Sequence, residues 1–147
     1  MANIKRIKST FSDQQQKALI NLRKRLHQNP ELSNQEFKSQ KTLLTYLNKL
    51  GINDVQTKET SIIAKIKGQD SEQPPVAIRG DIDALPIQEA TGHPNRSKYN
   101  NVMHACGHDV HSAWTMGAAS LLCNKSLKRD VLIIFQQAEE LATGAKM

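Results

Sequence analysis

The sequence predicts an α/β domain in which layers of helix pack on a mainly parallel or mixed sheet. Three observations indicate this fold class. Apolar residues recur at helical spacing up to Leu50, and from Val55 onward they alternate with polar residues at strand spacing. Two later apolar runs, Val76–Ile78 and Val131–Phe135, lead directly into carboxylates. Because open α/β sheets place ligands beyond the carboxyl ends of their strands, the sequence predicts a site where these runs end.

Two helices are predicted in the first third of the chain. The first covers residues 13–28, and the second carries an apolar stripe over residues 37–50 with Gly51 as its C-terminal cap. We expect both to be packing elements, and His27 to be a surface or capping residue rather than a ligand. The capping-box pattern precedes each helix, as Ser12 with Gln15 and as Ser33 with Glu36.

Carboxylates follow the predicted strands. Residues 62–67 alternate as a half-buried strand, and the runs at 76–78 and 131–135 are each followed by a pair of acidic residues. Adjacent residues on an extended backbone point in opposite directions, so the two glutamates of the second pair are expected to differ in role. One would bind metal and the other would handle a proton. The four carboxylates expected at this edge are Asp81, Asp83, Glu139 and Glu140.

The segment His104–His111 concentrates metal-binding chemistry. It holds three of the five histidines and one of the two cysteines, and imidazole and thiolate are preferred zinc ligands. In an extended segment Cys106 and His108 would point the same way, into one pocket. Ordinary packing and capping is the alternative. A closed structural zinc site is disfavoured, because the other cysteine, Cys123, lies in an apolar helical run.

A loop and a helix frame this segment. Residues 89–103 contain the glycine, proline and asparagines of an irregular loop, which would deliver the histidines to the site. Asp109 is expected to cap a helix that begins near Val110, with its N-terminus toward the site. Small residues on that helix would let it lie close to the sheet. The roles of His104 and His111 stay open.

Composition excludes several classes of protein. The net charge is +6, but residues 1–80 hold 14 Lys and Arg against 7 Asp and Glu, whereas residues 81–147 hold 6 against 7. The basic excess therefore avoids the expected site, and Arg23–Arg25 has no interleaved aromatics, which argues against nucleic-acid binding. Ala113–Cys123, the longest apolar stretch, is too short to cross a membrane. With no secretory signal at the start and only two cysteines, we expect a cytoplasmic protein.

Four segments together resemble a known family: Leu26–Ser33, Arg79–Ile87, His104–Asp109 and Gln137–Glu140. They occur in the order and spacing of the aminoacylase and hippurate-hydrolase branch of metallopeptidase family twenty, which also includes plant hydrolases of auxin conjugates. That resemblance implies a three-layer α/β/α fold like that of zinc exopeptidases. It also implies a metal-dependent amidohydrolase that cleaves N-acyl amino acids.

The resemblance implies a role for each matching residue. Cys106 would bridge two divalent metal ions, His108 would bind one ion, and Glu140 would bind the other. The ions would be zinc or manganese, with cobalt or nickel as alternatives. Glu139 would take a proton from a metal-bound water and deliver it to the departing amine. Asp81, Asp83 and Asp109 would have supporting roles around the ligands.

The chain departs from this family in length and in one loop. Relatives run to more than twice its length, so residues 1–147 are expected to be the N-terminal part of one catalytic domain. Further histidine ligands and an inserted domain that helps pair subunits into homo-oligomers would be absent. Gln137 and Leu141 stand where relatives usually have proline and glycine. A truncated, non-catalytic remnant or a metal-binding module is therefore the alternative to an enzyme acting on small N-acyl substrates.

Overall fold

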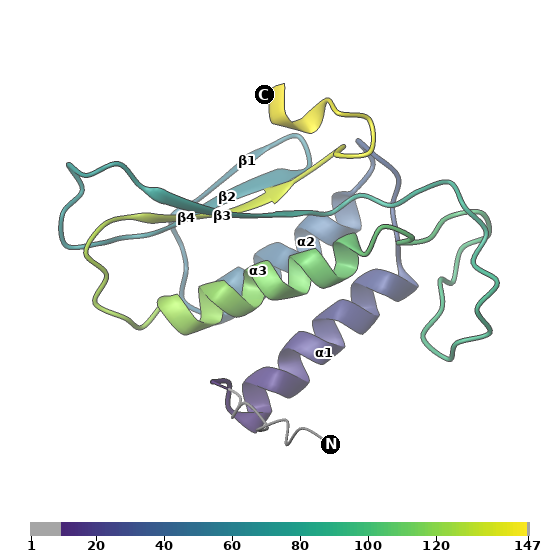
Figure 1. Ribbon diagram of the computed structural model, residues 1–147, viewed down its shortest axis with the longest axis horizontal. Coiled ribbons are helices and arrows are strands. Elements are labelled where there is room, and N and C mark those ends of the chain that lie inside the picture. The colour runs from purple at the N-terminus through teal and green to yellow at the C-terminus, as the bar shows by residue number, and fades with distance from the viewer. Residues whose placement is uncertain (1–9, 147) are drawn as a thin grey trace, which may run out of the picture.

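The computed structural model describes residues 10–146. The start of the chain, where the sequence predicts no secretory signal, lies outside these described residues. The described chain forms a four-stranded mixed sheet with three α-helices and a short 3-10 helix (Figure 1). The predicted α/β class is confirmed. In chain order the elements are α1 (Asp13–Gln28), α2 (Phe37–Lys49), β1 (Val55–Lys58), β2 (Ser61–Ile66), β3 (Val76–Asp81), α3 (His108–Leu122), β4 (Val131–Gln136) and η1 (Gly144–Lys146).

The sheet has the order β1-β2-β4-β3. β2 pairs antiparallel with both β1 and β4, whereas β3 and β4 are parallel and are joined through α3. Parallel neighbours need such a crossover, because the chain must return to the starting edge. In this register Asp81 pairs with Gln136, so β3 and β4 end together. The residues that follow both strands therefore emerge at the same edge.

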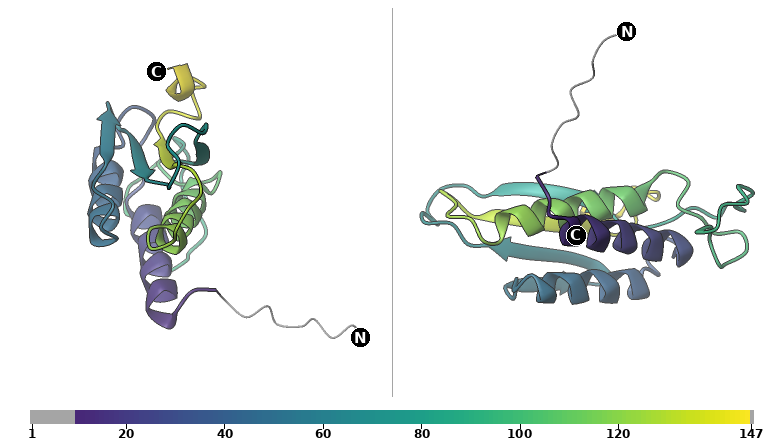
Figure 2. Two further views of the ribbon diagram at one scale, coloured as in Figure 1. Left: turned by 90° about the vertical axis from the view of Figure 1, so that its left-hand side faces the viewer. Right: turned by 90° about the horizontal axis from the view of Figure 1, so that it is seen from below.

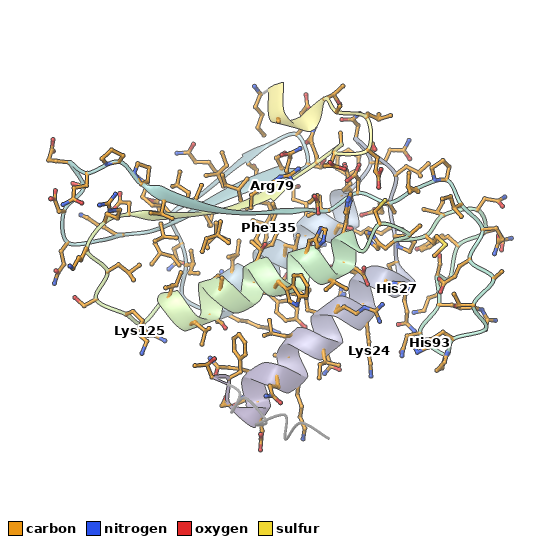
Figure 3. The ribbon with its side chains drawn as sticks, in the orientation of Figure 1. Lys24, His27, Arg79, His93, Lys125 and Phe135 are labelled. Carbon is orange, nitrogen blue, oxygen red and sulfur yellow. The ribbon has the colours of Figure 1, made fainter. Side chains whose placement is uncertain are left out.

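One face of the sheet forms the core with the helices. Ile62, Ile133 and Phe135 are fully buried on this face, whereas Ile63 on the opposite face is 42% exposed. Helices α2 and α3 lie against the core face, and α1 lies beyond α3 (Figures 1 and 2). Figure 3 shows Phe135 between the sheet and α3. Among the described residues, the three α-helices therefore lie on one side of the sheet.

The first helix is capped as predicted and the second is not. The Gln15 amide donates to Ser12 Oγ (3.2 Å), and the Ser12 amide donates to Gln15 Oε1 (2.9 Å). The predicted capping box of Ser33 and Glu36 is wrong, because α2 begins at Phe37 without a side-chain cap. Both side chains have distant partners instead: Ser33 bonds to Asp83, and Glu36 bonds to Thr60 and Ala138.

Helix α3 begins two residues earlier than predicted. Its N-cap is Gly107, whose φ of 80° lies in the left-handed region that glycine adopts most readily. Asp109 is therefore inside the first turn and is not the cap; its carboxylate is buried against Arg23 and His27. Gly80 on β3 allows α3 to lie close, because a Cβ there would come within 2.6 Å of Thr115 Oγ1.

Candidate metal centre

The shared edge of β3 and β4 faces the N-terminus of α3. Ligand atoms of Cys106, His108 and Glu140 lie within 4.8 Å of one another at this point. His108 is the first residue of α3, Cys106 lies in the preceding turn, and Glu140 lies in the turn after β4. The structure thus brings together the three residues that we predicted as metal ligands. Cys106 and His108 meet across a turn into the helix rather than along the extended segment that we expected.

His108 is oriented by Asp83. Its Nδ1 lies 3.0 Å from the Asp83 carbonyl oxygen and 3.1 Å from Oδ1, and because both are acceptors Nδ1 carries the hydrogen. In the neutral ring, Nε2 is then left with a lone pair. Three carboxylates surround this nitrogen, at 3.6 Å from Glu139 Oε2, 3.7 Å from Asp81 Oδ1 and 3.8 Å from Glu140 Oε1.

The carboxylates also determine the protonation of His108. Burial lowers the pKa of His108, but the hydrogen bond to Asp83 and the charges of Asp81 and Asp83 outweigh it and raise the pKa to about 8. Burial raises the pKa of Asp83, yet hydrogen bonds from His108, the Glu140 amide and Ser33 bring it down to about 2. Asp83 therefore stays ionised at neutral pH.

Asp83 joins the two halves of the centre. While Oδ1 faces His108, Oδ2 accepts the Ser33 hydroxyl (2.7 Å) and the Glu140 backbone amide (3.0 Å). The carboxylate is fully buried, and all of its partners are donors. One side chain thus fixes both the ring of His108 and the backbone of Glu140, which come from sequence positions 32 residues apart.

The donor set at Cys106 suits a divalent cation. The Cys106 residue is exposed. The pKa of its thiol rises to about 11, first because of a hydrogen bond to Glu140. Partial desolvation of the thiol and the negative charges of Glu140, Glu139 and Asp83 raise it further. Glu140 Oε1 is buried without a hydrogen-bond partner in the described part of the chain. A bound cation would favour the thiolate and satisfy this oxygen. Thiolate, imidazole and carboxylate are the ligand types of zinc sites.

His111 is a nearby residue to which the sequence assigned no role. Its Nδ1 donates to Asp81 Oδ1 at 2.7 Å, and its ring centroid lies 5.6 Å from that of His108. Ligand atoms of Asp81, His108 and His111 form a second group within 4.8 Å. Because His108 and His111 are three residues apart on one helix, they lie on the same face. This spacing is the feature of the sequence that could have predicted that His111 lies near the site.

A buried polar cluster supports the start of α3 from the opposite side. The predicted surface position of His27 is wrong: its ring nitrogens lie 2.9 Å from Asp109 Oδ2 and 3.3 Å from Glu89 Oε1, at the end of α1 (Figure 3). Arg23 Nε also lies 2.7 Å from Asp109 Oδ2. His104 is buried beside them, and burial, opposed by the charge of Asp109, lowers its pKa to about 4. His104 is therefore neutral at pH 7.

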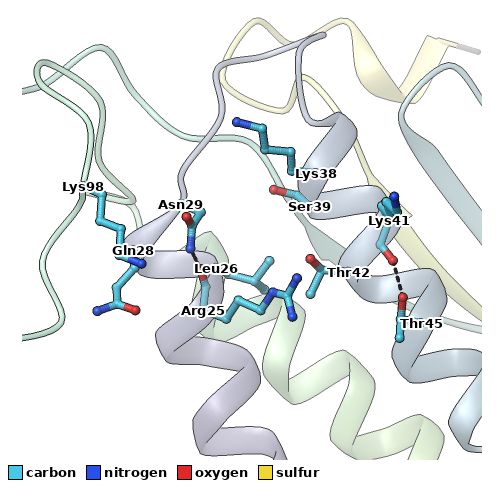
Figure 4. A pocket seen from close by; sticks show the side chains of 10 residues that line it. All are labelled: Arg25, Leu26, Gln28, Asn29, Lys38, Ser39, Lys41, Thr42, Thr45 and Lys98. Atoms are coloured by element: carbon cyan, nitrogen blue, oxygen red, sulfur yellow. Dashed lines mark hydrogen bonds between the residues drawn. The ribbon is translucent and has the colours of Figure 1, made fainter.

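A separate cavity lies between α1 and α2 (Figure 4). It has a volume of about 510 Å³, and none of its lining residues is a carboxylate, an imidazole or a thiol. It therefore offers none of the side chains that make up the metal centre. It is lined by Arg25, Leu26, Gln28, Asn29, Lys38, Ser39, Lys41, Thr42, Thr45 and Lys98.

Comparison with known families assigns the centre to a lineage. The profile of peptidase family M20/M25/M40 matches residues 77–147, which contain all seven residues predicted for the site. Over these residues the chain is similar to that family. The resemblance inferred from the motifs is thereby confirmed.

None of the helices in the described residues is long and apolar enough to span a membrane.

Individual relatives agree with this assignment. The chain is 49% identical to an N-acetylcysteine deacetylase of Bacillus subtilis, over 87% of this chain and 34% of the relative. It is 43% identical to an N-acetyldiaminopimelate deacetylase of Geobacillus thermodenitrificans, over 86% and 34%. A crystal structure of a dinuclear metal-binding M20 peptidase from Bacillus subtilis superposes with a TM-score of 0.87 at 45% identity, over 92% of this chain and 39% of that one. The chain spans about a third of the length of the curated relatives it matches.

Proposed function

We propose that this protein is a metal-dependent amidohydrolase that hydrolyses the amide bond of small N-acyl amino acids. The observation that carries the proposal is the convergence of Cys106, His108 and Glu140 within 4.8 Å, beside Glu139. Two of the relatives are named as deacetylases of N-acetylated amino acids, which supports this substrate class.

Cys106, His108 and Glu140 would hold two divalent ions, with zinc or manganese favoured over cobalt or nickel. A bound divalent ion supplies the Lewis acidity that lowers the pKa of water to about 7 and polarises the amide carbonyl. His108 suits this role because Asp83 holds its Nδ1 and directs Nε2 toward the centre. The dinuclear relative supports the number of ions.

Glu139 would be the general base and acid. Its side chain is 39% exposed, whereas that of Glu140 is 17% exposed, so Glu139 has more access to water and substrate. Its carboxylate would take a proton from the attacking water and return it to the amine nitrogen as the amide C–N bond breaks. Asp81 and Asp83 would support the ligands, and Asp109 would anchor the start of α3 through Arg23.

Residues 1–147 would form the N-terminal part of one catalytic domain, with the remaining ligands supplied by sequence that the longer relatives contain. We further propose a cytoplasmic, homo-oligomeric enzyme that binds neither nucleic acid nor membranes. The separation of the basic excess from the site supports the absence of a nucleic-acid role.

The test is hydrolysis of N-acetylcysteine and N-acetyldiaminopimelate by the purified protein loaded with zinc or manganese. Glu139→Gln is expected to lower kcat by about 100-fold or more while the metal content stays unchanged. Glu140→Gln is expected to lower the metal content itself. Tight metal binding without turnover of any N-acyl amino acid would instead favour the metal-binding module. Loss of neither metal nor activity in the two variants would exclude the assigned roles.

A further inference from the structure

Glu36 is a fully buried carboxylate whose partners lie far away in the sequence. Its Oε2 accepts the hydroxyl of Thr60 at 2.6 Å, and its Oε1 accepts the backbone amide of Ala138 at 2.9 Å. Ala138 lies 102 residues away and immediately precedes Glu139. Glu36 is the N-cap of α2, but its carboxylate makes no capping bond. The side chain is thus committed to the turn after β4.

Gln137 supports the same turn. Its side chain is buried, and Oε1 accepts the amides of Thr60 (2.7 Å) and Ser61 (3.0 Å) at the start of β2. Its Nε2 donates to Asn34 Oδ1 at 3.2 Å and to Glu59 Oε2. Its backbone amide donates to Ser61 Oγ at 3.2 Å, a bond that proline at this position could not make. The turn is therefore tied to the β1–β2 hairpin on one side and to Glu36 on the other.

The backbone around these contacts has an uncommon conformation. Ala138 has a φ of 46°, and the two partners of the Gln137 amide group, Asn34 and Glu59, have φ values of 65° and 51°. Residues with a Cβ rarely adopt positive φ and keep it only where surrounding contacts enforce it. The hydrogen bond from Ala138 to Glu36 is such a contact.

The two backbone amides on either side of Glu139 are held by buried carboxylates. Glu36 accepts the amide of Ala138, and Asp83 accepts the amide of Glu140. We propose that Glu36 is a positioning residue that sets the direction of the Glu139 and Glu140 side chains; this rests on the proposed function of those two residues. Glu36 holds this turn at Ala138, and Asp83 holds it at Glu140.

The test compares Glu36→Ala, Glu36→Gln and Leu43→Ala in the same chain. Leu43 is a fully buried core residue of α2, so its truncation controls for general destabilisation. The first readout is amide hydrogen exchange by NMR at Ala138, relative to the amides of the central strand β4. The second readout is a titration with Co²⁺ alone, in which binding is monitored through the thiolate-to-cobalt absorption of Cys106. The carboxamide of Glu36→Gln keeps an oxygen that can accept the Ala138 amide.

Glu36→Ala is expected to accelerate exchange at Ala138 about tenfold more than in β4, and to weaken Co²⁺ binding by about tenfold or more. Glu36→Gln should keep both the exchange rate at Ala138 and the Co²⁺ affinity of the unsubstituted protein. Leu43→Ala should accelerate the exchange of all amides alike without weakening Co²⁺ binding. Parallel behaviour of Glu36→Ala and Leu43→Ala would overturn the proposal. If Glu36→Ala does not fold, Thr60→Val, which removes the hydroxyl donor to Glu36, decides in its place: faster exchange at Ala138 than in β4 supports the role and equal exchange overturns it.

The two readouts also separate this inference from the proposed function. If the unsubstituted protein binds no Co²⁺, the metal centre fails, but the exchange rate at Ala138 still decides whether Glu36 holds the turn. If Co²⁺ binds and Glu140→Gln abolishes the binding, the centre stands, and unchanged binding in Glu36→Ala would overturn the positioning role alone.

Discussion

His108 donates its Nδ1 hydrogen to Asp83, which lies within 3.1 Å through both its carboxylate and its carbonyl oxygen. This contact selects the tautomer, since neither acceptor can donate a hydrogen in return. It leaves Nε2 of the neutral ring to bind a cation, at a point that three other carboxylates surround. The proposed metal centre would therefore depend on a residue that would not itself touch a metal.

Asp83→Asn is expected to weaken zinc binding by about 10-fold to 100-fold. Asparagine can accept from His108 through its oxygen, but its amide nitrogen would then face the Ser33 hydroxyl and the Glu140 amide, which are donors. Isothermal titration with zinc measures the change. Ser33→Ala is the control, because it removes one donor and leaves His108 and Glu140 in place. Equal zinc affinities in Asp83→Asn and the unsubstituted protein would contradict the role of Asp83.

The stability of the metal-free protein should fall as the pH rises through the pKa of His108. That pKa is about 8, above the value of 6.5 expected for the unfolded chain, so the folded state binds the proton more tightly. The contribution is fully present below about pH 6.5 and is lost above about pH 8, and it amounts to about 2 kcal/mol.

Urea unfolding at several pH values measures this contribution, with His108→Gln as the control. The variant lacks the titrating ring, so its stability should change less over the same window. A stability that rises from about pH 6.5 to about pH 8.5 in the unsubstituted protein would refute the assignment, since the sign would be opposite.

Cys106 should react slowly with iodoacetamide although it is exposed. Only the thiolate reacts, and the adjacent Glu140 is the first cause of the rise of the Cys106 pKa to about 11. Glu140→Gln removes that charge and should accelerate alkylation of Cys106 by about tenfold at mildly alkaline pH. Mass spectrometry of the labelled peptides measures both cysteines at once. Cys123, at the far end of α3, is the internal control, and its rate should not change. An unchanged rate at Cys106 would show that Glu140 does not control the thiol.

The elements that local sequence determines could be predicted most closely. Helix α1 has the predicted bounds because its capping box involves residues three apart, and both bonds form. The capping box of α2 was predicted wrongly because Ser33 and Glu36 bond across 50 and 102 residues, and such contacts leave no periodic signal. Propensity is overridden where a buried tertiary partner is available.

The position of the candidate site could also be predicted, because the parallel strands β3 and β4 end at the same edge and deliver the residues that follow them. The surroundings of its ligands could not be predicted. His27 and Asp109 look like ordinary surface and capping residues in the sequence, but together they form a buried contact across 82 residues. Asp109 also contacts Arg23, and His27 also contacts Glu89, and these contacts likewise join residues far apart in the sequence.

The strand order β1-β2-β4-β3 also constrains the order in which the molecule can assemble. β4 is the last of the described strands, yet it lies between β2 and β3 and is the only described strand that pairs with β3. When only the first 130 residues have been synthesised, β3 has no neighbouring strand to pair with, and the Glu36 carboxylate lacks the Ala138 amide that it accepts in the folded protein. Closure of such long-range contacts is slow because loop entropy is lost before pairing is gained. The sheet and the centre should therefore form together, in one step, only after β4 and the turn that follows it have left the ribosome.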